Sequence, residues 1–119
     1  MSHYQAPLGD MSFQLFDVWQ VQQFWQQQAE LAELIDTDTA AAILEEAAKI
    51  TAEKIAPLAA AADEQGVSCV SGEVTTPSHY KECYQLLCEG GWTGLSGDPE
   101  YGGMGMPKSL SGLYDEMMC

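Results

Sequence analysis

Apolar residues recur every three or four positions along most of the chain, with polar residues between them. This spacing is typical of helices that bury one face. It predicts a short helix over 11–18 with Asp10 as its N-cap, followed by an amphipathic helix over 19–35 that is interrupted once. A long helix follows from about Asp38 or Thr39 to Gly66, with a bend at Pro57, which cannot donate a backbone hydrogen bond.

Two further helices are expected in the second half of the chain. One covers about 77–89, with Thr76 as N-cap and Pro77 in the first turn. The other begins at Pro107 or Lys108. On the first we expect Tyr80, Tyr84, Leu87 and either Cys83 or Cys88 to be buried. The apolar side of the second contains Leu110, Leu113, Tyr114, Met117 and Met118.

Between the long helix and the next one, the segment 67–74 has a different pattern. Valines flank Ser71-Gly72, a pair suited to a tight turn, so we expect a small turn or weak hairpin.

A glycine-rich run interrupts the helical pattern over 90–107. It contains seven of the eleven glycines and two of the five prolines. Such a segment must form a shaped loop, and we expect Trp92 and Tyr101 to hold it against the core. The glycine backbone then passes close to another surface, which is either a ligand or a neighbouring helix.

These patterns predict an all-α fold, an antiparallel bundle of four to six helices with the glycine-rich loop before the last. With 119 residues the chain is long enough for one domain with a modest core, and 46% apolar residues is ordinary for a globular protein. Within it we distinguish an N-terminal extension with the first helices, 1–36, from a helical domain over 37–119.

Charge and cysteine content narrow the possible functions. A net charge of -14 argues against binding of nucleic acid or of an anionic membrane surface. The sequence contains neither a signal peptide nor an apolar run long enough to span a bilayer, so we expect a cytoplasmic location. The four cysteines and two histidines match no metal-site spacing, and we expect reduced, structural thiols.

The order Gly-Trp-Thr-Gly-Leu over 91–95, then Asp-Pro-Glu-Tyr-Gly-Gly-Met-Gly-Met-Pro over 98–107, resembles the loop that closes the N-terminal helical domain of acyl-CoA dehydrogenases. Residues 44–58 resemble the long helix of that domain with its internal proline, and 72–77 resemble the lead-in to the next helix. The opening, 4–13, is similar to an N-terminal extension in a bacterial branch of the family. The resemblance covers effectively the whole chain.

This resemblance implies an FAD-dependent oxidoreductase of fatty acid metabolism that forms a double bond between the α and β carbons of an acyl-CoA thioester. It implies that the catalytic glutamate and most flavin contacts come from domains outside these residues, so the fragment alone should be inactive. We expect the chain to form part of the wall of the acyl pocket and of the oligomer contacts. The candidate substrate-binding residues are Tyr101, Gly102, Gly103, Met104, Gly105, Leu110, Leu113, Tyr114 and Met117.

The partners implied are the acyl-CoA substrate, further copies of the same chain and an electron-transfer flavoprotein as electron acceptor. With so negative a chain, the phosphates of coenzyme A should be bound elsewhere in the molecule. The final helix ends abruptly at Cys119 and should leave apolar surface uncovered, so we expect a piece of a longer enzyme. Two alternatives stay open: a non-enzymatic acidic helical interaction module, and an acyl-CoA oxidase of the same superfamily.

Overall fold

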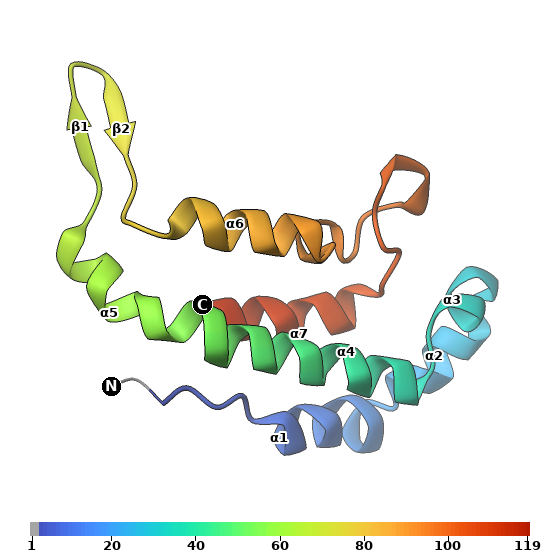
Figure 1. The fold of residues 1–119 in the computed structure, drawn as a ribbon. Helices are drawn as coiled ribbons and strands as arrows, with labels where there is room; N and C mark the ends of the chain where they lie inside the picture. The colour runs from blue at the N-terminus through green and yellow to red at the C-terminus, as the bar shows by residue number, and fades with distance from the viewer. Residues whose placement is uncertain (1–2) are drawn as a thin grey trace.

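The computed structural model describes residues 3–119, and helices form most of it (Figure 1). One long helix runs through the middle, and successive long segments alternate in direction around it, as the sequence predicted. It consists of α4 (Thr37–Ile50), a π-helical turn (Thr51–Ile55) and α5 (Ala56–Gln65). The other helices are α1 (Leu8–Ser12), continued by a π-helical segment (Phe13–Val18), α2 (Val21–Gln27), α3 (Ala29–Leu34), α6 (Tyr80–Glu89) and α7 (Lys108–Met118). The all-α bundle with a glycine-rich loop before its last helix is confirmed.

The core lies where α1 and α7 pack against α4. On α4 the residues facing inward are small or medium in size, Ala40, Leu44 and Ala47, each 0–1% exposed. Alanines let the neighbouring helix approach closely, and α7 fills this space with Leu110 and Met117. Residues of the N-terminal segment complete the same core, among them Met11, Leu15, Trp25 and Ile35. The described part of the N-terminal segment, 3–36, therefore shares one core with the rest of the chain.

Local signals explain the boundaries of the long helix. Asp36 is the N-cap of α4, and the backbone N–H of Thr39 donates to its Oδ1 at 2.7 Å. At the other end Gly66 closes α5 with φ +66°, as predicted. The distortion expected from Pro57 takes the form of the π-helical turn directly before it.

Most helices start within two residues of the predicted position, but two of the predicted starts are wrong by three residues. The first helix begins at Leu8, because the N–H of Met11 already bonds the carbonyl of Pro7, so Asp10 lies inside the first turn. The helix expected from Thr76-Pro77 begins at Tyr80, because Gln65 Oε1 accepts the backbone N–H of Ser78 and holds this stretch in a turn. The single interruption predicted in 19–35 is confirmed and lies at Gln28.

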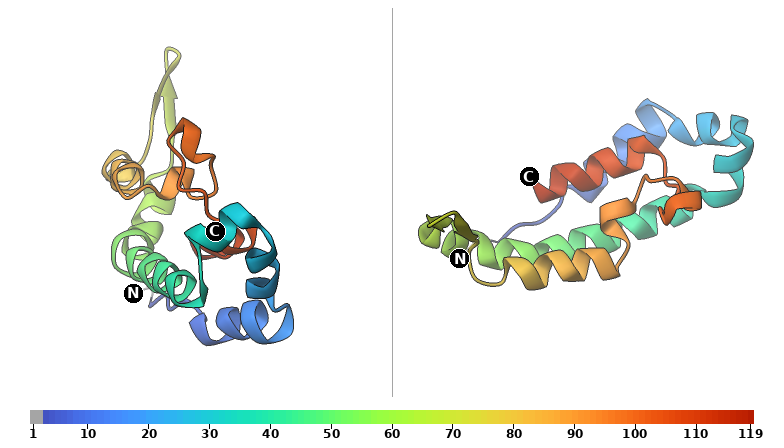
Figure 2. Two further views of the ribbon diagram at one scale, coloured as in Figure 1. Left: turned by 90° about the vertical axis from the view of Figure 1, so that its right-hand side faces the viewer. Right: turned by 90° about the horizontal axis from the view of Figure 1, so that it is seen from above.

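The predicted burial on α6 is also wrong. Tyr80 and Tyr84 are 48% and 66% exposed, Cys88 is exposed, and only Cys83 and Leu87 of the expected set are half-buried. The helix lies beside α5 (Figure 2). A hollow of about 380 Å³ is lined by residues of both helices, by Ile55 of the π-helical turn and by Met118 of α7. The helical spacing correctly identified one apolar face of α6, but few other residues of the chain cover that face.

The segment after α5 forms the expected hairpin. Strands β1 (Ser68–Val70) and β2 (Glu73–Thr75) pair antiparallel, and Ser71 and Gly72 make the turn with φ of +53° and +83°. Figures 1 and 2 show that this ribbon stands away from the helices. All residues of both strands are exposed.

The molecule is more extended than a compact domain. Its radius of gyration is 16.7 Å, against about 13.5 Å for a globular chain of this length. Its accessible surface is 8224 Å², against about 6300 Å² expected for its mass. The sequence predicted that the last helix leaves apolar surface uncovered. This prediction is wrong, because Leu110, Tyr114 and Met117 of α7 are at most 9% exposed. The exposed apolar side chains lie on other segments and include Phe13, Trp19, Phe24, Val70, Val74 and Tyr84.

Candidate functional site

The glycine-rich loop between α6 and α7 has an inner limb, 90–97, and an outer limb, 98–107, and hydrogen bonds between the two limbs close it. The N–H groups of Met104, Gly105 and Met106 donate to the carbonyls of Gly94, Gly97 and Leu95, each at 2.9 Å. Short 3-10 turns at Trp92–Gly94 and Pro99–Tyr101 shape the limbs. Because these backbone groups bond one another, the loop has a fixed conformation and not the flexibility usual for glycine-rich segments.

The two limbs cross where Gly97 meets Gly103. A Cβ added at Gly103 would lie 2.1 Å from the carbonyl carbon of Gly97, a contact that no side chain can adopt. The glycines predicted a close approach of the loop backbone to another surface. At this point the surface is the other limb of the same loop. This explains two of the glycines without a ligand.

Leu95 and Trp92 attach the loop to the core. Leu95 is 7% exposed, and the Trp92 ring stacks on Tyr114 of α7 with 5.2 Å between centroids and 23° between planes. Tyr101 was expected to do the same, but its side chain is 84% exposed. Tyr101 is the last residue of the 3-10 turn Pro99–Tyr101, and at this position its ring lies in solvent and not against the core.

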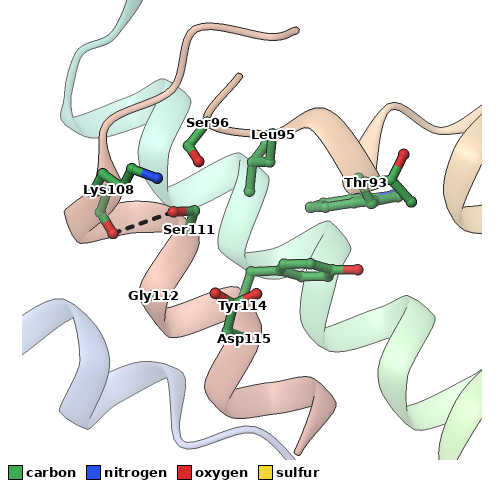
Figure 3. Close-up of a pocket in the computed structure, with 9 residues that line it drawn as sticks. Thr93, Leu95, Ser96, Lys108, Ser111, Gly112, Tyr114 and Asp115 are labelled. Atoms are coloured by element: carbon green, nitrogen blue, oxygen red, sulfur yellow. Dashed lines mark hydrogen bonds between the residues drawn. The ribbon is translucent and has the colours of Figure 1, made fainter. Parts of the chain in front are cut away.

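A pocket of about 330 Å³ lies between the inner limb of the loop and one face of α7 (Figure 3). Thr93, Ser96 and Ser111 bring hydroxyl groups to it, and Lys108 and Asp115 bring one charge of each sign. Ser111 Oγ donates to the Lys108 carbonyl at 3.3 Å. Burial, together with the nearby Asp115 carboxylate, raises the pKa of Tyr114 above its usual value. These groups can orient a polar molecule, but they include no nucleophile paired with a base.

The structure separates the predicted substrate-binding residues into two groups. Those of the loop lie on its outer limb, where Tyr101, Gly102 and Met104 are exposed and Gly103 and Gly105 half-buried. Those of α7 belong to the core: Leu110, Tyr114 and Met117 are buried and Leu113 is half-buried. Of all these residues, Tyr114 lines the pocket between loop and helix.

Sequence reasoning missed the polar residues of this pocket. A signal for them existed, because Lys108, Ser111, Gly112 and Asp115 follow one another at steps of three, one and three and so share one face of a helix. That face is polar, whereas the predicted lining residues of this helix belong to its apolar face.

The residues present do not fit a flavin nucleotide or a coenzyme A phosphate on their own. Both ligands carry phosphates that proteins usually hold with several cations or with a helix N-terminus. The chain has 4 lysines and arginines against 18 acidic residues, and at the pocket Lys108 is accompanied by Asp115. Within residues 3–119, His, Cys, Asp and Glu form no group of three that could hold a metal ion. In the same residues no helix is long and apolar enough to cross a membrane.

The long helix, the glycine-rich loop and the last helix lie within a part of the chain that matches a known protein family. Residues 37–118 match the family model "Acyl-CoA dehydrogenase, N-terminal domain". The chain therefore belongs to the acyl-CoA dehydrogenase family, and this match includes the glycine-rich loop and α7.

A comparison with curated proteins identifies a relative in the bacterial branch that the N-terminal segment resembled. The chain is 36% identical over 117 residues to 3-methylmercaptopropionyl-CoA dehydrogenase of Ruegeria pomeroyi. The aligned part is 97% of this chain but 19% of that protein, so the chain spans about a fifth of the length of the relative it matches.

Proposed function

We propose that this chain is the N-terminal helical part of an FAD-dependent acyl-CoA dehydrogenase that forms the α,β double bond of an acyl-CoA thioester. The observation that carries the proposal is the match of residues 37–118 to the N-terminal domain of this family. The relative from Ruegeria pomeroyi, whose name states an acyl-CoA dehydrogenase activity, supports it. The proposal includes a cytoplasmic location and an electron-transfer flavoprotein as acceptor.

In this proposal the chain has a positioning role. As the family resemblance implies, the flavin and the glutamate that removes the α proton come from parts of the enzyme outside these residues. The pocket described above agrees with this, because a single lysine and a single aspartate are its only charged groups. The chain contributes to the acyl-pocket wall with the outer limb of the loop, Tyr101 to Gly105, and with Leu110, Leu113, Tyr114 and Met117 of α7. Met104 supports the loop assignment, because its flexible apolar side chain is 49% exposed.

The test uses the complete gene product that contains this chain. We expect it to purify with bound flavin, and we expect an acyl-CoA thioester to bleach the flavin absorbance in the absence of oxygen. The panel should include 3-methylmercaptopropionyl-CoA beside saturated thioesters of several lengths. A flavin-free protein, or a flavoprotein that none of the thioesters reduces, would contradict the proposal. Hydrogen peroxide production in air at the rate of turnover would indicate an oxidase.

The role of the loop can be tested in the same protein. Met104→Ala should raise KM for the thioester with little change in thermal stability, because the side chain is half exposed. Leu86→Ala on α6, also partly exposed at 38%, is the matched control and should leave KM unchanged. An unchanged KM in the Met104 variant would exclude Met104 from the acyl-pocket wall and leave the family assignment intact.

The second candidate function is a non-enzymatic interaction module. The exposed aromatic residues favour it, since Trp19 and Phe24 are 74% and 58% exposed on neighbouring segments. The flavin measurement separates the two candidates, because an interaction module would carry no flavin.

A further inference from the structure

The hairpin after α5 lacks the support that a two-stranded ribbon needs. Its strands have three residues each and are exposed on both faces, and Val67, Val70 and Val74 are 64–70% exposed. Isolated two-stranded hairpins are only marginally stable in water, whereas three or more strands with an apolar face can be stable. A further strand would supply the missing support.

The geometry of the hairpin determines which backbone groups point outward. The register pairs Val70 with Glu73 next to the two-residue turn and Cys69 with Val74 one step further. In such a hairpin the residues beside the turn bond each other, so the peptide groups of the following pair point away from the partner strand. The β1 edge therefore presents the N–H and C=O of Cys69, and the β2 edge presents those of Val74.

Charge distinguishes the β1 edge from the rest of the molecule. The stretch 66–72 contains no charged residue, although the whole chain has a net charge of -14. Two copies of so acidic a chain repel each other over most of their surfaces, but along β1 their backbones can approach without bringing like charges together. The β2 edge differs because it carries Glu73. Lysine, proline and bulges, which commonly protect edge strands, are missing from Ser68–Val70.

From these observations we infer that β1 is an assembly edge that pairs with β1 of a second copy of the chain, antiparallel about a two-fold axis at Cys69. The pairing joins two ribbons into one sheet of four strands. Val67, Cys69 and Val74 share one face by the alternation of a strand, so the sheet gains a continuous apolar face. The inference rests on the homo-oligomer of the proposed function and names one of its contacts.

Cross-linking at Cys69 tests the geometry in the complete gene product with every other cysteine replaced by serine. The two Cys69 Cα atoms would lie about 5.5 Å apart, within the 4.4–6.8 Å range of disulfides. Oxidation should therefore give a covalent dimer on non-reducing gels. The control is Cys69→Ser with Val74→Cys. Residue 74 is also exposed but lies on the far edge, about 14 Å from its copy at three strand spacings. This variant should therefore give no covalent dimer.

A second pair of variants tests the contact without cross-linking. Cys69→Glu places two carboxylates opposite each other at the two-fold axis, and we expect it to raise the dissociation constant of the assembly about fivefold or more. Val74→Glu adds the same charge on the far edge and should leave that constant unchanged. Both are measured by sedimentation at several protein concentrations.

Each other outcome overturns the inference. A monomeric wild-type protein, a lack of cross-linking at Cys69, equal cross-linking at both positions, or equal effects of the two glutamates would each show that β1 does not pair with its copy. The flavin and thioester measurements are independent of these results, so failure of the assembly contact is distinguishable from failure of the proposed function.

Discussion

Two regions of this molecule differ in how their backbone hydrogen bonds are formed and in how far their apolar side chains are buried. The region formed by α4, α7 and the glycine-rich loop has a closed core, and the loop's limbs bond each other. The region formed by α6 and the hairpin has exposed tyrosines and valines, and its hairpin stands away from the helices (Figure 1).

The difference shows that a similar sequence pattern can have different structural consequences. Both α6 and α7 have apolar residues at helical spacing, but Leu110 of α7 is 0% exposed while Tyr84, on the apolar face of α6, is 66% exposed. The first region has a closed core, whereas the second leaves apolar side chains exposed. We expect substitutions in the first to change folding and substitutions in the second to change association.

The largest effect is expected at the crossing of the loop. Gly103→Ala would place a Cβ 2.1 Å from the Gly97 carbonyl carbon, so the limbs must separate. We expect the free energy of unfolding, measured with urea on the purified protein, to fall by about 3 kcal/mol or more. Gly112→Ala on α7 is the control, because an added Cβ meets nothing within 4 Å there and should stabilise the helix by about 0.5–1 kcal/mol. Equal effects of the two substitutions would contradict the crossing.

The next effect compares the same substitution in the two regions. Leu110→Ala removes a fully buried side chain at the interface of α7 with α4 and should cost about 3 kcal/mol. Leu86→Ala removes a partly exposed one and should change the free energy of unfolding by less than about 0.5 kcal/mol. A large loss in the Leu86 variant would show that α6 is packed more firmly than its exposure indicates.

A smaller effect is expected at the start of α6. His79 has φ +71°, a conformation that costs energy in residues other than glycine. His79→Gly should therefore raise stability by about 1 kcal/mol. His79→Ala removes the imidazole but keeps the Cβ, so it should bring no gain, and hydrogen exchange of the first turn of α6 would report both. A gain in the alanine variant would attribute the effect to the imidazole.

The smallest effect is local to the start of α4. The Thr39 N–H holds the pKa of Asp36 below its usual value. Because the folded pKa is lowered, the stabilisation is present above the unfolded value of about 3.9 and is lost as pH falls through the folded pKa. Hydrogen exchange in the first turn of α4 should therefore be faster in Asp36→Ala at neutral pH, and the difference should disappear in acid. Asp36→Asn keeps an acceptor without this titration, so a pH-dependent change in it would contradict the assignment.

The sequence predicted the helices and the turn because their causes are local. Gly66 and the Ser71-Gly72 turn act through the conformations of single residues, and the apolar spacing defined the α7 face correctly. The start of α6 was missed because Gln65, thirteen residues before Ser78, accepts its backbone N–H. A bond across that distance is not visible in a local capping pattern.

The site was less predictable for the same reason. The glycines indicated a close approach, but nothing in their order shows that Gly97 meets Gly103. Tyr101 looked like an aromatic anchor, whereas Trp92 takes that role because it faces Tyr114. The proposed acyl-pocket residues stay a prediction, since their surroundings depend on what contacts the outer limb of the loop.

The closed loop also has a consequence for the order of folding. The hydrogen bonds between its limbs join residues that are close in sequence, such as Gly94 and Met104. Loops of about ten residues close within about 10–100 ns. By contrast, the contact between Thr51 and Met118, at the far end of α7, joins residues 67 positions apart. We expect the loop to close early and to fix the direction in which α7 leaves it. The slower step, the packing of α7 against α4, then starts from a helix whose direction is already set.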